Sequence, residues 1–251
     1  FNMFHAYPNE WAVEGTDKLQ SAMFGPDYRE NTRKALLKLQ EYYQKGYFNP
    51  DFATYDDAMM QQDIFNDKCG VVFMDLWGAY WPLVLHLDMN PNADWVPVPI
   101  VSCDDQPAKT NNNMYSVNNI IVAKKGVEHP EAVVKMANLY HDLNNNPETM
   151  EFSVYNTDPV DNNQIFLAYP LLIYNPSFNY EGYLAISEAM KTGDTSKLCA
   201  AYKMFYDQAV AYRDNQDKSG FPAYRSYTDE GCLGVQNYYI KNKLMQMNEY
   251  D

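Results

Sequence analysis

Positively charged side chains are scarce in this sequence. Its 251 residues include 19 Lys and Arg against 33 Asp and Glu, which gives a formal net charge of -14. Binding of nucleic acid depends on clustered Lys and Arg that contact phosphates, so this balance argues against a nucleic-acid partner. It disfavours anionic membrane surfaces for the same reason. A net charge of this size favours solubility but identifies no partner.

Long hydrophobic segments and paired cysteines are also missing. The longest apolar run, residues 81–87, is interrupted by Pro82 and His86. It is far shorter than the roughly 20 apolar residues of a membrane-spanning helix. The cysteines form no C-x-x-C pair and have no zinc-ligand spacing, so we expect no metal site. An even number permits two disulfides, but isolated cysteines are usually core thiols, and we expect free thiols at Cys69, Cys103, Cys199 and Cys232.

Motifs of the common enzyme classes are absent. The sequence contains no G-x-S-x-G nucleophile elbow, no Walker loop, no G-x-G-x-x-G and no H-E-x-x-H. Adjacent carboxylates such as Asp56–Asp57 are expected by chance in an acidic chain. We therefore expect no catalytic activity and no cofactor. An unrecognised carboxylate pair for glycoside hydrolysis remains the alternative.

Aromatic residues, by contrast, are abundant. They make up 15% of the chain, with 22 Tyr, 12 Phe and 4 Trp. Tyr combines a flat apolar ring with a polar tip, which suits a surface that binds something both apolar and hydroxylated, such as a sugar. Compositional bias is the other interpretation, because the chain is also rich in Asn, for example at residues 111–113 and 144–146.

Hydrophobic periodicity and turn residues divide the chain into elements. The pattern predicts helices at 26–46, 54–68, 79–90, 129–144, 180–192, 194–214 and 222–243. It predicts strands at 70–74 and 117–124, and an edge or extended segment at 94–100, which contains two prolines. Strands and helices alternate in the first half, and helices accumulate in the second. We therefore expect a helix-rich α/β fold, with a small sheet wrapped by several helices.

The most informative stretch is the aromatic loop at residues 68–83. A predicted buried strand ends there, and crevices at the carboxyl ends of strands are where open α/β sheets bind ligands. Trp77 and Trp81 can stack on the C–H groups of a sugar ring, and Asp75 can accept hydrogen bonds from its hydroxyls. The alternative is that the two indoles, four residues apart, form one helix face in the core.

Several stretches are similar to a known family. They are FHAYPNEW (4–11), YYQKGYFNPDFA (42–53), FNDKCGV (65–71), PNADWVPVPI (91–100), HPEAVVK (129–135) and MKTGDTSKL (190–198). In this order they resemble the extracellular solute-binding proteins (family 1-like) of carbohydrate ABC transporters, specifically the lipoprotein type common in Gram-positive bacteria. The family's aromatic loop often reads Gly-Pro-Trp-Trp. Here residues 74–76 differ from that motif and Trp77 matches it.

The resemblance implies a periplasmic-binding-protein-like (type II) fold. Such proteins have two α/β lobes that are joined by hinge strands and close on a sugar. Residues 1–251 would be the later portion of one solute-binding protein. Residues 1–114 and 160–251 would belong mainly to the C-terminal lobe, and residues 115–160 would cross toward the N-terminal lobe. A signal peptide and a lipid-anchoring cysteine would precede the chain.

The resemblance also implies a function. The protein would bind an oligosaccharide without chemistry, at the cell surface, and deliver it to the permease subunits of an ABC importer. Ring stacking and hydroxyl recognition would fall to Tyr7, Trp11, Asp75, Trp77, Trp81, Tyr224 and Arg225. For Tyr224 and Arg225 the alternative is an exposed helix start with a surface Arg. We also expect an exposed patch around Trp77 and Trp81, and dimerisation through it. A glycoside-processing enzyme fragment and a cell-surface protein-interaction module are the alternative functions.

Overall fold

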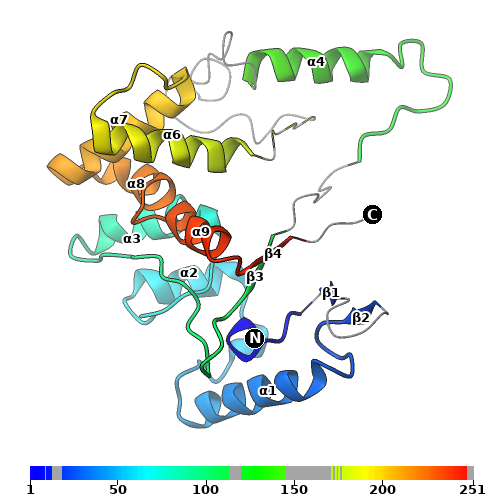
Figure 1. The fold of residues 1–251 in the computed structure, drawn as a ribbon, viewed down its shortest axis with the longest axis vertical. Coiled ribbons are helices and arrows are strands. Elements are labelled where there is room, and N and C mark those ends of the chain that lie inside the picture. The colour runs from blue at the N-terminus through cyan, green and yellow to red at the C-terminus, as the bar shows by residue number, and fades with distance from the viewer. Residues whose placement is uncertain are drawn as a thin grey trace.

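The computed structural model describes residues 1–8, 10–12, 19–112, 120–144, 171, 173, 175 and 177–247. Helices make up most of this part of the chain (Figure 1). The α-helices are α1 (Arg29–Gln44), α2 (Asp57–Phe65), α3 (Leu83–Met89), α4 (Ala132–Asn144), α6 (Phe178–Thr192), α7 (Ala200–Asn215), α8 (Phe221–Tyr227) and α9 (Cys232–Lys241). The 3-10 turns are η1 (Asn2–Phe4), η2 (Phe52–Thr54), η3 (Leu76–Ala79) and η5 (Lys218–Gly220).

Strands are few and short. β1 (Trp11–Ala12) pairs antiparallel with β2 (Gln20–Ser21), and β3 (Thr110–Asn112) pairs parallel with β4 (Met245–Met247). The two pairs belong to separate sheets, with β3 and β4 next to α9 and with β1 and β2 in the N-terminal part (Figure 1). The structure therefore confirms the helix-rich character of the fold, and the described residues contain no larger sheet.

The predicted strand at residues 70–74 is wrong for the described structure. This segment is extended, but it pairs with no described strand, and most of its side chains are exposed. Residues 94–100 are also extended without strand pairing, as their prolines predict, and residues 120–124 form no strand. Residues 117–119 lie outside the described part. An apolar segment becomes a strand only when another backbone pairs with it, and no described segment does so here.

Local signals set several helix ends. Asp56 caps α2 by accepting a hydrogen bond from the backbone N–H of Met59 at 2.8 Å. Gly193, which the sequence predicts as a break, ends α6 in the left-handed conformation with φ 75°. The single helix predicted at 222–243 is instead two helices, α8 and α9. At the turn between them, a Cβ on Gly231 would lie 2.8 Å from the carbonyl oxygen of Arg225.

The largest hydrophobic core lies between α6, α7, α8 and α9. Its buried members are Tyr183, Ile186, Phe205, Ala209, Ala223, Tyr227 and Leu233. Phe205 on α7 and Tyr227 on α8 stack with their ring centroids 4.6 Å apart. A second cluster joins η3 and α3 to α7 and α8, and its members are Ala79, Leu87, Tyr212 and Phe221. The two clusters together hold η3 against α8.

The N-terminal part has a small cluster of its own. Tyr7, Ala22 and Tyr28 are buried together, and the two tyrosine rings meet edge to face at 6.1 Å. The backbone N–H of Cys103 donates to the carbonyl of Met3 at 2.9 Å, so the loop after residue 101 lies against η1. This cluster is separate from the core that carries η3 and α8.

The four cysteines are free thiols, as expected, although Cys103 is exposed and the others are only partly buried. Within the described ranges, no three His, Cys, Asp or Glu side chains are placed to hold a metal ion. None of the helices described above is long and apolar enough to cross a membrane.

Candidate functional site

The aromatic loop forms a well-anchored turn on the helical core. The carboxylate of Asp75 caps η3 by accepting a hydrogen bond from the backbone N–H of Trp77 at 3.0 Å. The small residues Gly78 and Ala79 face inward and are buried. Leu76 also packs against the core, and the hydroxyl of Tyr80 is buried, so the large side chains left on the outer side of the turn are the two indoles.

Both indoles of the loop lie on that outer side. The side chains of Trp77 and Trp81 are 48% and 53% exposed, so they do not form a buried helix face. The Trp77 ring contacts the ring of Tyr80 at 5.9 Å, and the backbone N–H of Trp81 donates to the Trp77 carbonyl at 3.0 Å. The rings are therefore positioned by their neighbours while much of their surface stays open to a ligand.

Helix α8 contributes Tyr224 and Arg225 next to this turn. The hydroxyl of Tyr224 donates to the carboxylate of Glu230 at 2.9 Å. Arg225 Nη2 lies 2.6 Å from Asp94 and Nη1 lies 3.6 Å from Glu230. Burial, together with the Glu230 carboxylate, raises the pKa of Tyr224. Its phenol therefore stays neutral at physiological pH and keeps its hydrogen for donation.

The expected role of Arg225 needs correction. Its side chain is only 8% exposed, so it is neither a surface Arg nor a free fork of donors for ligand hydroxyls. Its guanidinium instead holds two carboxylates, those of Asp94 and Glu230, which are 60% and 68% exposed. Arg225 therefore positions acidic side chains at the rim of the site.

Asp75 and Arg225 converge on the start of α9. Burial raises the pKa of the Cys232 thiol, the negative charge of Asp75 adds to that rise, and the positive charge of Arg225 opposes it. Both charges therefore lie within electrostatic reach of the same sulfur. We call the group formed by Asp75, Trp77, Trp81, Tyr224 and Glu230 the η3–α8 surface.

The structure does not bring Tyr7 and Trp11 to the η3–α8 surface. Tyr7 is 4% exposed and packs against Tyr28, so its ring is part of a core and faces no cleft. Trp11 is exposed, but it lies on β1 in the N-terminal part, away from α8 (Figure 1). Two aromatic side chains that the resemblance implies for the site are thus placed elsewhere in this structure.

No protein-family model matches the chain, and searches of curated proteins and of solved structures found no match either. The resemblance to solute-binding proteins therefore rests on the sequence motifs.

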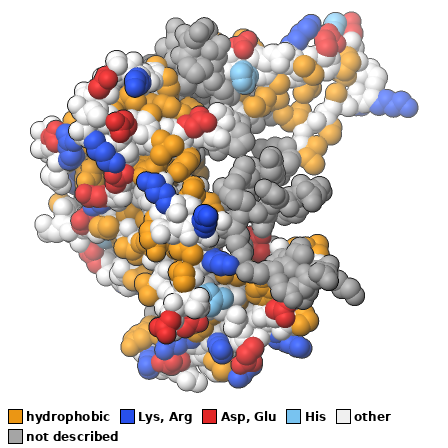
Figure 2. Space-filling view, in the orientation of Figure 1, with side chains coloured by type: hydrophobic (Ala, Val, Ile, Leu, Met, Phe, Trp, Pro, Cys, Tyr) orange, Lys and Arg blue, Asp and Glu red, His pale blue; other side chains and the backbone are white. Residues whose placement is uncertain are grey.

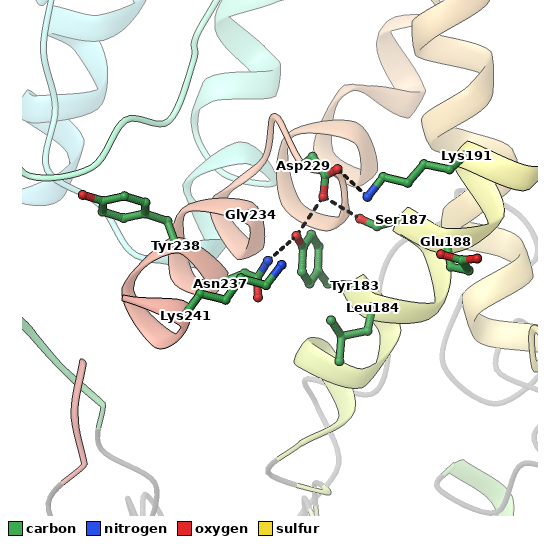
Figure 3. A pocket seen from close by; sticks show the side chains of 10 residues that line it. All are labelled: Tyr183, Leu184, Ser187, Glu188, Lys191, Asp229, Gly234, Asn237, Tyr238 and Lys241. Carbon is green, nitrogen blue, oxygen red and sulfur yellow. Dashed lines mark hydrogen bonds and ion pairs between the residues drawn. The ribbon is translucent and has the colours of Figure 1, made fainter. Parts of the chain in front are cut away.

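A pocket that the sequence did not indicate lies between α6, α9 and the turn that precedes α9 (Figure 3). It has a volume of about 360 Å³. The Asp229 carboxylate accepts hydrogen bonds from the hydroxyls of Tyr183 at 2.8 Å and Ser187 at 3.1 Å, and it pairs with Lys191 at 2.9 Å. The side-chain amide of Asn237 donates to the Tyr183 hydroxyl at 2.9 Å. We call this the α6–α9 pocket.

The protonation states in the α6–α9 pocket are well defined. The hydrogen bond from Lys191, with those from Tyr183 and Ser187, lowers the pKa of Asp229 although partial burial opposes this. Burial and the nearby Asp229 charge raise the pKa of Tyr183 to about 12. At neutral pH the pocket therefore contains an ionised carboxylate and a neutral phenol.

These interactions predict a pH-dependent contribution to stability. Because the pKa of Asp229 is lower in the folded state, its contribution is complete above the ordinary value of 3.8 and is lost as the pH falls through the folded value. We expect Asp229→Asn to be less stable than the wild type at neutral pH, and the difference to shrink on acidification. Urea unfolding at a series of pH values measures it. Asp105→Asn, in the exposed loop, is the control, and an equal pH response of the two variants would contradict the prediction.

Proposed function

We propose that this protein binds a sugar at the η3–α8 surface and carries out no chemistry on it. Two half-exposed indoles lie there on a turn that the Asp75 carboxylate caps, and the turn packs on α8, where Tyr224 contacts the carboxylate of Glu230. Indole faces stack on the apolar face of a sugar ring, and carboxylates accept hydrogen bonds from its hydroxyls. The combination suits a neutral ligand that is apolar on one face and hydroxylated at its edge.

The observation that carries this proposal is the fixed and open position of Trp77. The ring remains 48% exposed, although the Asp75 cap and the packing of η3 on α8 hold its backbone. A side chain that is already ordered loses less conformational freedom when a ligand binds, which favours affinity. A Trp that served only the core would be buried.

The wider proposal follows the sequence resemblance. The protein would be the sugar-binding component of a carbohydrate ABC importer, with a periplasmic-binding-protein-like (type II) fold, and would act at the outer surface of the cell. It would pass an oligosaccharide to the membrane permease subunits. In the same proposal, residues 115–160 would cross toward the N-terminal lobe.

Exposed apolar side chains in three extended segments support the proposal that another lobe or chain covers them. Val71, Val98 and Ile120 lie in extended segments and are 78%, 70% and 83% exposed. Exposed apolar side chains of this kind are typical of surfaces that a partner covers. In Figure 2, hydrophobic side chains lie among charged ones on the visible face and along the extended segment that precedes α4. A second lobe or a second copy of the chain would cover such segments.

Substitution of Trp77 tests the proposed site. We expect Trp77→Ala to weaken binding of an oligosaccharide by about two- to tenfold, because a ring stack contributes roughly 0.5–1.5 kcal/mol. Trp77→Phe should retain part of the affinity, since it keeps an aromatic face. Isothermal titration calorimetry with gluco-, manno-, galacto- and xylo-oligosaccharides measures the effect, and mass spectrometry checks that the ligand remains intact.

The matched control is Phe24→Ala, which removes another exposed aromatic ring outside the η3–α8 surface. Its affinity should equal that of the wild type. Detection of a cleaved ligand would contradict the proposed binding function and would support a glycosidase function instead. Equal affinities of Trp77→Ala and Phe24→Ala would contradict the proposed site.

A further inference from the structure

We propose that the α6–α9 pocket is a second ligand site and that it takes a neutral, polyhydroxylated molecule such as one or two sugar units. The ligand class follows from the charges and hydrogen bonds of this pocket, independently of the η3–α8 surface. The pocket contains none of the residues that the sequence indicates for ligand binding, although Lys191 belongs to the MKTGDTSKL stretch.

The pocket has a polar floor that is already ordered. Tyr183, Ser187 and Asn237 are buried, with 2%, 6% and 8% of their surfaces exposed, and they connect through hydrogen bonds to Asp229 and to one another (Figure 3). The hydroxyl of Tyr180 donates to the other end of the Asn237 amide at 3.0 Å, which fixes its orientation. Binding there requires little reorganisation of side chains.

The charges around the pocket balance one another. Lys191 and Lys241 line it together with Asp229 and Glu188, so each sign is present twice. Lys191 is already paired with Asp229, so the pocket has no net charge that would favour an anion or a cation. A neutral ligand needs no such net charge. Its hydroxyls can donate to the carboxylates and accept from the lysines, because a hydroxyl does both.

Size and apolar contacts agree with this ligand class. The volume of about 360 Å³ lies at the lower end of the roughly 300–1,000 Å³ of small-molecule sites. Leu184 and the ring of Tyr183 supply apolar lining next to the polar groups, whereas the ring of Tyr238 points away from them (Figure 3). A sugar ring presents this mixture of C–H and O–H groups within a small volume.

The pocket and the η3–α8 surface share one turn. Asp229 faces the pocket, and the next residue, Glu230, accepts from Tyr224 on the other site. A variant that changes this turn would affect both sites, so the test needs a substitution on α6. Leu184 suits this purpose because it lines the pocket and is 46% exposed.

The experiment titrates the protein with sugars and observes residues of the pocket by NMR. The full chain, labelled with ¹⁵N, is titrated with maltose, cellobiose, xylobiose and their monosaccharides. The backbone amide of Gly234 and the side-chain amide of Asn237 report on the pocket, because both residues line it. We expect sugar-dependent shifts of both signals in the wild type. In Leu184→Trp the apparent affinity from these shifts should fall by at least about tenfold, because the indole occupies the space.

Leu36→Trp is the matched control, since it places the same side chain at a similarly exposed position on α1. It should bind like the wild type. Lys241→Ala, at an exposed position on the pocket rim, should weaken binding with little effect on folding. Equal urea midpoints for all variants would establish that each is folded.

The outcomes separate the two sites. Absence of sugar-dependent shifts at Gly234 and Asn237 overturns the second site, and binding that is lost only in Trp77→Ala would then leave the η3–α8 surface as the site. Shifts that persist in Trp77→Ala but vanish in Leu184→Trp support the pocket, even if the η3–α8 surface fails. Stronger shifts with inorganic phosphate or with ammonium ion than with any sugar overturn the neutral ligand class.

Discussion

Replacement of Arg225 by alanine is expected to lower the free energy of unfolding by about 2–3 kcal/mol. The side chain is 8% exposed, and its guanidinium lies 2.6 Å from Asp94 and 3.6 Å from Glu230. Removal of a buried charge from such a pair costs about 3–5 kcal/mol when the remaining partner is buried as well. Here both carboxylates are more than half exposed, so water solvates them after the substitution and the cost is smaller.

Urea unfolding of Arg225→Ala and Arg213→Ala measures this difference. Arg213 also pairs with a carboxylate, that of Asp214 at 2.6 Å, but these side chains are 41% and 49% exposed. We expect the control to change stability by less than about 0.5 kcal/mol. Calorimetry with the oligosaccharide panel completes the test. An unchanged stability of Arg225→Ala together with lost sugar binding would show direct contact between Arg225 and the ligand, which contradicts the positioning role.

The helices could be predicted from the sequence because their signals are local. The break at Gly193 and the hydrophobic periodicity of α1 each lie within or next to the element that they define, although Leu36 and Leu37 of α1 are about half exposed. The turn between α8 and α9 was missed. Its cause is the close approach of the Gly231 backbone to Arg225, which the hydrophobic pattern does not reveal.

The strand prediction at residues 70–74 failed for the opposite reason. The segment at residues 70–74 has the apolar composition of a buried strand, yet a strand also needs a second backbone at hydrogen-bonding distance. That partner is not encoded in the segment itself. The described part of the chain supplies none, so the apolar side chains of Val71 and Phe73 remain exposed.

The same distinction between local signals and contacts of distant segments applies to the candidate site. Asp75, Trp77 and Trp81 lie within one short stretch, so the sequence could place them together. The resemblance implies a ligand-binding role for Arg225, whereas the fold pairs it with Asp94, which is 131 residues away in the sequence. The α6–α9 pocket could not be found in this way. Asp229 reaches Tyr183 across 46 residues and Ser187 across 42, and none of the three stands in a recognisable motif.

Substitution of Gly220 by alanine is expected to destabilise the fold by about 3 kcal/mol. A Cβ at this position would lie 2.0 Å from the carbonyl oxygen of Gln208 and 3.0 Å from the amide nitrogen of Tyr212. Both atoms belong to the backbone of α7, so no side-chain rotation relieves the overlap. Helix α8, which begins at the next residue, would have to move away from α7.

The same displacement would act on the candidate site, because α8 carries Tyr224 and contacts η3. We therefore expect Gly220→Ala to weaken sugar binding as well as to lower the urea midpoint. Gly70→Ala is the matched control. Nothing lies within 4 Å of its Cβ, so its stability should stay within about 0.5 kcal/mol of the wild type. Equal midpoints for the two variants would contradict the close packing of α7 and α8. A lower midpoint with unchanged affinity would instead show that sugar binding depends on η3 and its indoles without α8.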